Sequence, residues 1–138
     1  MRLIVCCFII GFITFSLQAE DQPSSLPFSK AVRVDNMLYL SGELGVVPST
    51  KALVPGGIGP ETRQTMENIK ATLEANGSDM SHVVKCFVML ADIGEWAEMN
   101  AVYRTYFKGR FPARSAMGAG GLALGARVEI ECMAEVIR

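Results

Sequence analysis

The chain has 138 residues, 50% of them hydrophobic and 20% charged, and its formal net charge at pH 7 is −1. This length and composition suit one globular domain with enough apolar side chains to form a core. The near-zero charge, without a run of basic residues, argues against a protein that grips the phosphates of a nucleic acid.

The N-terminus has the features of a secretory signal peptide. A basic residue precedes an apolar run over residues 3–15, and Ala19 is followed by a polar segment. We predict a signal peptide over residues 1–19 and a mature single domain over residues 20–138, located in the periplasm or secreted, without membrane contact after cleavage. Leu17 is larger than the usual residue two positions before a cleavage site. An uncleaved N-terminal membrane anchor is therefore the alternative.

The mature chain opens with a predicted β-hairpin followed by a loop. Residues 31–34 and 37–41 are β-prone, and they flank Asp35-Asn36, two residue types that tolerate the left-handed backbone of a tight turn. Residues 46–60 are rich in glycine and proline and predict a loop, with a short strand near Leu53.

The first predicted helix begins at Pro60, a residue favoured at the first helical position, and ends at Gly77. Its apolar stripe recurs at steps of three and four and consists of Met66, Ile69 and Leu73. Asn76-Gly77-Ser78 matches a glycosylation acceptor, but asparagine before glycine is also an ordinary helix C-terminus, which we favour.

The second half of the chain predicts a strand, a helix and two closing strands. Residues 83–90 lack clean alternation, which is typical of a central strand covered on both faces. Asp92 and Glu95 resemble a capping box for a helix whose apolar stripe is expected in the core. That stripe consists of Trp96, Met99, Tyr103 and Phe107. The closing strands are predicted over residues 113–119 and 127–136, around a glycine-rich connection.

Elements in this order predict an α+β fold, with a mixed β-sheet and two helices packed on one of its faces. Cys86 and Cys132 both lie on apolar strand patterns, and we favour buried thiols, with a disulfide between neighbouring strands as the alternative. His82 is the only histidine, so metal chelation is poorly supported and no metal site is predicted.

Two charged residues near the C-terminus are the candidate catalytic groups. Arg114 offers planar paired donors that match a carboxylate bidentately. Glu129 lies fifteen residues later on a strand whose alternate residues are apolar, so Glu129 and Glu131 share its other face. A glutamate so placed can hold or deprotonate a water. Together the two groups suit hydrolysis of a small acid.

Five short sequence motifs support this interpretation, because their order and spacing resemble the RidA (YjgF/YER057c/UK114) family across residues 26–137. The motifs are Pro27-Phe28-Ser29-Lys30-Ala31-Val32, Leu40-Ser41-Gly42-Glu43-Leu44-Gly45, Thr62-Arg63-Gln64 with Asn68-Ile69, Asn100-Ala101-Val102-Tyr103 with Tyr106-Phe107, and Pro112-Ala113-Arg114-Ser115 with Val128-Glu129-Ile130-Glu131.

The resemblance implies the RidA/chorismate-mutase-like fold and a homotrimer with active sites at its interfaces. It implies hydrolytic deamination of 2-imino or enamine acids (2-aminoacrylate, 2-iminobutanoate, 2-iminopropanoate) to 2-keto acids and ammonia, without a cofactor. The alternative is a non-catalytic protein of the same fold that binds small carboxylates such as keto acids. An RNA-cleaving role attached to relatives is poorly matched by this acidic chain, so no nucleic acid partner is expected.

The resemblance also assigns roles to single residues. Arg114 would grip the substrate carboxylate and Glu129 would orient or activate water. The remaining substrate-binding positions are Phe28 as an aromatic wall, Ser41, Gly42, Asn100, and the main chain at Ala116. Many relatives carry tyrosine in place of Phe28 and cysteine in place of Ala116. Gly120-Gly121-Leu122-Ala123 stands where an arginine-leucine-proline motif is more usual in the family, which puts the substrate range in doubt.

Overall fold

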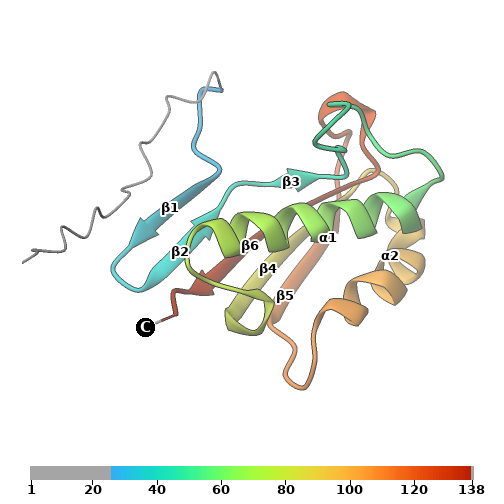
Figure 1. The fold of residues 1–138 in the computed structure, drawn as a ribbon. Helices are drawn as coiled ribbons and strands as arrows, with labels where there is room; N and C mark the ends of the chain where they lie inside the picture. The colour runs from blue at the N-terminus through green and yellow to red at the C-terminus, as the bar shows by residue number, and fades with distance from the viewer. Residues whose placement is uncertain (1–25, 138) are drawn as a thin grey trace, which may run out of the picture.

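The computed structural model describes residues 26–137, so the predicted signal peptide lies outside the described residues. Six strands form one sheet, and two α-helices pack against it (Figure 1). The strands are β1 (Ala31–Val34), β2 (Met37–Leu40), β3 (Glu43–Leu44), β4 (Val83–Leu90), β5 (Ala113–Gly118) and β6 (Val128–Glu135). The helices are α1 (Ile58–Ala75) and α2 (Trp96–Tyr103), with 3-10 turns at Met80–His82, Ile93–Glu95, Arg104–Tyr106 and Ala123–Gly125. None of the described helices is both long and apolar enough to cross a membrane.

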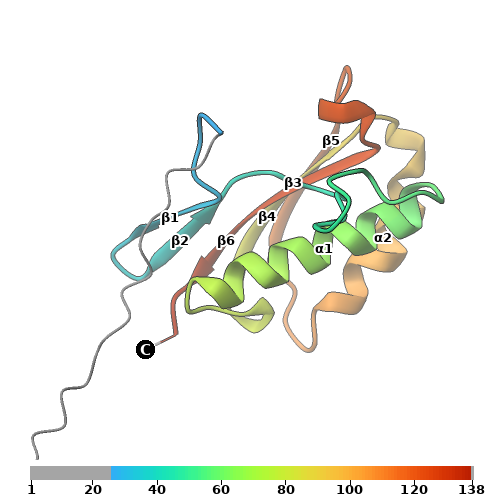
Figure 2. The same ribbon diagram turned by 45° about the horizontal axis from the view of Figure 1, so that its top comes forward.

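The sheet is mixed, as predicted. Its strand order is β1-β2-β6-β4-β5, and β3 pairs with the first part of β6. Among the described strands only β4 and β5 pair in parallel, and the connection between them contains α2, because parallel neighbours need a crossover. Both helices lie on the same face of the sheet (Figures 1 and 2). The predicted α+β architecture is confirmed.

The core lies between this face and the helices. Along β6 buried side chains alternate with partly buried ones, so one face of the strand meets α1 and the other is left uncovered by the described chain. Residues from the helices and both central strands fill the core, and the fully buried ones include Met66, Ile69, Leu73, Met99, Val88, Leu90, Val128 and Ile130.

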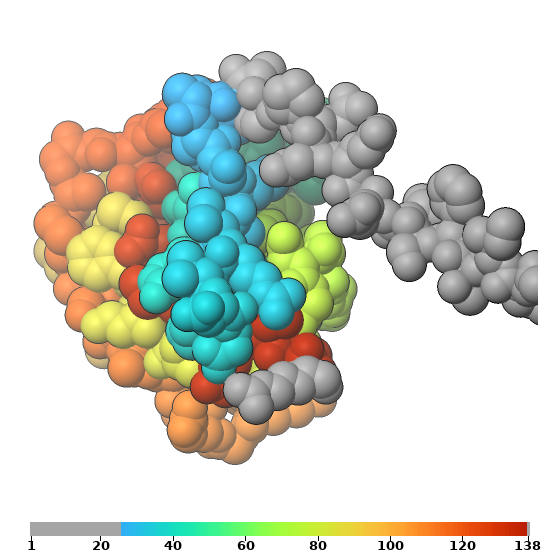
Figure 3. Space-filling view, turned by 90° about the vertical axis from the view of Figure 1, so that its left-hand side faces the viewer, coloured from blue at the N-terminus to red at the C-terminus, as the bar shows by residue number. Residues whose placement is uncertain are grey.

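Within residues 26–137, no helix lies on the second face of the sheet. Figure 3, viewed from the side of the β1–β2 hairpin, shows atoms coloured as β4 and β6 reaching the surface on one side of the hairpin, with α1 on the other. Strand β4 is central, but it alternates between buried and partly buried residues. The expectation that one chain covers both faces of β4 is therefore wrong.

Several element boundaries differ from the predicted ones. Helix α1 begins at Ile58, two residues before Pro60, because Ile58 is buried against the core and Gly57 takes the positive φ of 91° that precedes it. Leu53 forms only an isolated bridge with Val46. The short strand β3 was not predicted, since two residues carry no periodicity. Gly77 follows the C-cap Asn76 with a φ of 75°, so the predicted helix end is confirmed.

The predicted capping box before α2 is wrong. The side chain of Asp92 accepts a hydrogen bond from Gly94 N at 2.8 Å and caps a 3-10 turn, while the carboxylate of Glu95 binds the guanidinium of Arg127. Phe107 lies beyond the helix, although it is buried as predicted. Trp96 is 42% exposed, so this ring is not a core residue of the isolated chain.

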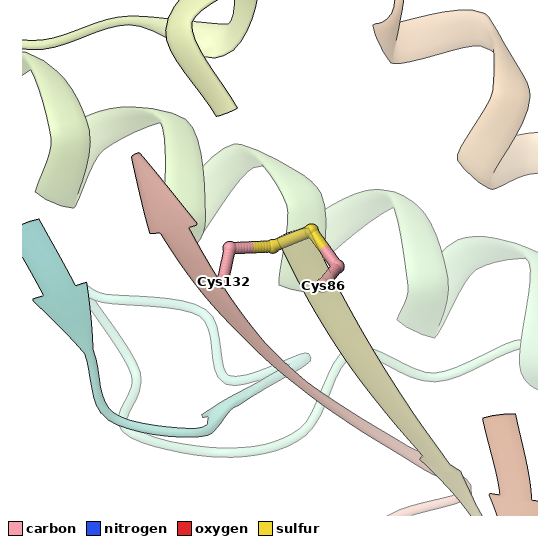
Figure 4. Close-up of a disulfide and its surroundings, with 2 residues drawn as sticks. All are labelled: Cys86 and Cys132. Atoms are coloured by element: carbon pink, nitrogen blue, oxygen red, sulfur yellow. A yellow bond between two sulfur atoms is a disulfide. The ribbon is translucent and has the colours of Figure 1, made fainter. Parts of the chain in front are cut away.

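The two cysteines of the domain form a disulfide, not the buried thiols that we favoured. Cys86 on β4 lies directly opposite Cys132 on β6, with their Cα atoms 4.1 Å apart (Figure 4). Directly opposed residues of an antiparallel pair are the ones whose side chains approach most closely, which is why the bridge forms there. It ties together the two central strands of the sheet.

Candidate active site

Arg114 is held on the helix-covered side of the sheet. It pairs in register with Cys86, whose side chain is fully buried beneath the helices, and parallel partners project to the same face. Its Nη1 donates a hydrogen bond of 2.6 Å to Oδ1 of Asn100 on α2. Ala116, two residues further along β5, packs against the same core. Three predicted site residues therefore share one side of β5.

Two aromatic rings of α2 also contact the Arg114 guanidinium. Its Cζ lies 4.7 Å from the centroid of the Tyr103 ring and 5.6 Å from that of Trp96. A cation over an aromatic face is attracted by the negative centre of the ring. The sequence predicts both rings in the core and does not reveal their contact with Arg114. The spacing of Trp96, Asn100 and Tyr103 at steps of four and three was the available signal, because it places them on one side of a helix.

A cavity of about 350 Å³ lies beside these groups. This volume is at the lower end of those found for small-molecule sites, which suits a compact ligand. The lining combines charged, amide and aromatic side chains, namely Asn100, Tyr103, Arg104, Phe111, Pro112 and Arg114. The cavity thus presents a guanidinium to a small anion within partly apolar walls.

Glu129 lies on the other side of the sheet. It alternates along β6 with the buried Val128 and Ile130, and it faces Met89 across the β4–β6 pair. Its carboxylate packs over Gly42, where a methyl group would overlap it. Because Gly42 has no side chain, it leaves the space that the Glu129 side chain occupies. Burial, and secondly the charge of Glu131, raises the pKa of Glu129.

Ser41, next to Gly42, is hydrogen-bonded to the segment that precedes β1. Its Oγ donates to Ser29 O at 2.7 Å, and its backbone N–H donates to Lys30 O at 2.9 Å. Phe28, next to Ser29, is 50% exposed. The strand end at Ser41-Gly42 therefore holds the segment of Phe28 near the strand that carries Glu129.

The predicted site residues thus fall into two groups within one chain. Arg114 and Ala116 lie on the helix-covered side of the sheet, where Asn100 of α2 contacts Arg114, whereas Gly42 and Glu129 lie together on the uncovered side. Sequence periodicity missed this separation, because it relates residues within a strand but not between strands. Within residues 26–137, no three His, Cys, Asp or Glu side chains cluster as metal ligands would.

Comparison with known proteins identifies relatives over most of the chain. Residues 19–136 match the family model described as "Endoribonuclease L-PSP". A Mus musculus protein named 2-iminobutanoate/2-iminopropanoate deaminase is 45% identical, over 78% of this chain and 80% of its own length. Its Bos taurus namesake is 47% identical, over 78% and 79%. The crystal structure of RidA from the Antarctic bacterium Psychrobacter sp. PAMC 21119 superimposes with a TM-score of 0.78 at 37% identity, covering 82% of this chain and 91% of that one.

Proposed function

Because this chain belongs to the RidA family, we propose that it hydrolyses small 2-imino acids and their enamine tautomers to 2-keto acids and ammonia. The observation that carries the proposal is the Arg114 guanidinium, held against Asn100 and two aromatic rings beside a cavity of small-ligand size. Candidate substrates are 2-aminoacrylate, 2-iminobutanoate and 2-iminopropanoate.

The reaction begins from the imine form of the substrate. An enamine becomes an imine when its β-carbon takes up a proton and its amino group loses one. Water then adds to the C=N carbon, the nitrogen is protonated, and the resulting amino alcohol collapses to a keto acid and ammonia. One water is consumed for each ammonia released, and nothing is oxidised or reduced.

Arg114 supplies the binding part of this chemistry. Two N–H groups of a guanidinium match the two oxygens of a carboxylate, which fixes the position of the adjacent C=N carbon. The main chain at Ala116, on the same side of β5, is the proposed neighbour of the bound substrate.

Glu129 supplies the proton-transfer part. A carboxylate with a raised pKa is a better base than an ordinary one while it remains ionised near neutral pH. We propose that it holds the attacking water together with main-chain groups at Gly42, and that Phe28 forms an aromatic wall.

Assembly completes the proposed site. Arg114 and Glu129 lie on opposite sides of the sheet in one chain, so we infer that Arg114 of one copy meets Glu129 of the next. A homotrimer with interface sites provides this arrangement. The uncovered sheet face supports it, because a hollow of about 260 Å³ with both apolar and charged lining residues lies there. Its lining residues are Tyr39, Leu40, Lys85, Phe87, Glu131, Cys132 and Met133.

The test measures keto acid release from 2-iminobutanoate generated in situ by an amino-acid oxidase. We expect the parent protein to accelerate release and Arg114→Ala to lose about a hundredfold or more in kcat/KM, because two charge-assisted hydrogen bonds disappear. Arg63→Ala, which removes an exposed cation from α1, is the matched control and should retain the parent rate. A folded parent without any rate would contradict the proposal.

Non-catalytic binding of small carboxylates is the second candidate. It is favoured because a single chain forms the cavity beside Arg114, and Glu129 does not line that cavity. Saturable binding of 2-ketobutyrate by a parent that does not accelerate deamination would select it. A ribonuclease activity that survives Arg114→Ala would instead point to the endoribonuclease activity for which the matching family is named.

We further propose that the protein is exported. The N-terminal sequence supports this, and so does the Cys86–Cys132 disulfide, because such bridges persist in oxidising compartments. Mass spectrometry of the periplasmic protein should find an N-terminus at Glu20. An intact Met1 in the membrane fraction would favour the uncleaved anchor, and a cytoplasmic protein with reduced cysteines would contradict export.

A further inference from the structure

We propose that Tyr103 and Trp96 are positioning residues for Arg114, acting through the faces of their rings and not through hydrogen bonds. The inference extends the function proposed above and rests on the role given there to Arg114.

A guanidinium carries five N–H donors, all in its plane. In the described part of the chain Arg114 donates one hydrogen bond, from Nη1 to Asn100. An aromatic ring attracts the cation through its face and takes up none of these donors. The two rings therefore restrain Arg114 while leaving its other N–H groups for a carboxylate. A second carboxylate or amide in their place would compete with the substrate.

The environment of Tyr103 supports a role for its ring and not for its hydroxyl. The side chain is only 3% exposed, and among the described residues its hydroxyl is buried without a hydrogen-bond partner. Burial raises the pKa of Tyr103 to about 12, although the charge of Arg114 opposes this effect. The phenol is therefore neutral at physiological pH, and it contacts Arg114 as an aromatic face and not as a phenolate in an ion pair.

The two rings have complementary positions. Tyr103 is fixed from behind by Phe107, whose ring centroid lies 4.9 Å away, so the Tyr103 ring is a rigid support. Trp96, at 42% exposed, covers the guanidinium from the beginning of the same helix. Asn100 lies between them in sequence and holds one end of the guanidinium. All three contacts come from α2, so this helix sets the direction of Arg114.

The experiment compares Tyr103→Phe, Tyr103→Leu and Trp96→Leu. Tyr103→Phe keeps the ring and should keep the parent KM for 2-iminobutanoate and the parent Kd for 2-ketobutyrate. Tyr103→Leu and Trp96→Leu each lose a cation–ring contact and should weaken both constants about three- to thirtyfold. The effect on KM should exceed the effect on kcat, because the lost contact orients the carboxylate-binding group.

Leu73→Ala is the matched control for a purely structural effect. It truncates a fully buried side chain of α1, whereas the three contacts to Arg114 described above come from α2. Thermal melts establish the temperature at which all variants are folded. If Leu73→Ala and Tyr103→Leu weaken binding equally, or if Tyr103→Phe weakens it as much as Tyr103→Leu, the inference is overturned. Trp96→Leu keeps the test decisive if Tyr103→Leu does not fold, because Trp96 is outside the core.

A second readout separates this inference from the proposed function. The Nε–H resonance of Arg114, assigned by its disappearance in Arg114→Lys, should be shifted by the ring currents of the two aromatic faces. It should stay in place in Tyr103→Phe and move in Tyr103→Leu and Trp96→Leu, whether or not the protein deaminates imines. An unchanged resonance in both leucine variants would overturn the inference, even if the deaminase assay succeeds.

Discussion

At the scale of single residues, the environment of Glu129 fixes the pH at which it ionises. Its pKa is raised first by burial and then by the like charge of Glu131, which shares its face of β6. A raised pKa keeps the acid protonated over a wider range, and a protonated acid cannot accept a proton from water.

The pH dependence of the reaction tests this role. We expect kcat/KM to fall as the pH drops through the raised pKa of Glu129, with the acid limb above the pH of an ordinary glutamate. Glu131→Gln removes the like charge and should move that limb to lower pH. Glu135→Gln removes a charge further along β6 and should leave it in place. A limb that does not respond to Glu131→Gln would contradict the assignment of the base.

A second glutamate secures the start of the strand that carries Glu129. Glu61 is 4% exposed, and its Oε1 accepts hydrogen bonds from the backbone N–H groups of Arg127, at 2.6 Å, and Val128, at 3.3 Å. A methyl group on Gly45 would overlap the Glu61 side chain, so Gly45 provides the space for this contact. Helix α1 therefore fixes the position at which β6 begins.

The stability of Glu61 variants tests this contact. Glu61→Ala leaves the buried N–H of Val128 and the partly buried N–H of Arg127 without this acceptor, and it should lower the free energy of unfolding by about 1–3 kcal/mol. Glu61→Gln retains an acceptor oxygen and should lose less. Glu74→Ala, on the exposed side of the same helix, should change stability by no more than about 0.5 kcal/mol. Urea unfolding measures all three, and an equal loss for the alanine and glutamine variants of Glu61 would count against the hydrogen bonds.

At the scale of elements, the disulfide crosslinks β4 to β6, two neighbouring strands inside the sheet. It closes a loop with a sequence separation of 46, and this limits the unfolded chain. We expect the oxidised parent to be more stable than Cys86→Ala/Cys132→Ala by about 2–4 kcal/mol. Urea unfolding with and without reductant measures the bridge apart from packing. Reductant should destabilise the parent and leave the double variant unchanged, and equal responses would contradict a disulfide.

The sequence predicted strongly patterned elements well. Residues 83–90 matched β4 at both ends, because a run of apolar and β-branched residues is bounded there by turn residues. The two helices and the mixed sheet followed from their order along the chain. The start of α1 and the strand β3 were missed, since these depend on packing against distant residues. The capping box failed because Glu95 has a stronger partner in Arg127, 32 residues away.

The candidate site was predictable residue by residue but not as an arrangement. The sequence motifs indicated Arg114, Asn100 and Glu129, and the structure places the first two in contact. The opposite orientations of Arg114 and Glu129 depend on the register of β4 with both of its neighbours, which no single strand reveals. The sequence of β4 suggested burial on both faces because Phe87 and Met89 are apolar, although they lie on the face that one chain leaves open.

At the scale of the whole molecule, assembly of several copies would account both for the open sheet face and for the separation of Arg114 from Glu129 within one chain. An apolar sheet face in a single chain is stabilised when another copy covers it. In the proposed assembly the same contact would bring Arg114 and Glu129 of two chains together, so assembly and activity would depend on one surface. We expect Arg114→Ala and Glu129→Gln each to be inactive alone, and together they can separate this arrangement from a site contained within one chain.

Mixing the two inactive variants by co-expression tests the arrangement. If each site takes Arg114 from one copy and Glu129 from the next, random mixing in equal amounts should make roughly one quarter of the sites intact and restore about that share of the activity. If both residues come from the same chain, every site stays defective and no activity returns. Arg114→Ala mixed with the Arg114→Ala/Glu129→Gln double variant is the control, because it can form no intact site. Restoration in the first mixture but not in the second would establish that neighbouring copies share the site.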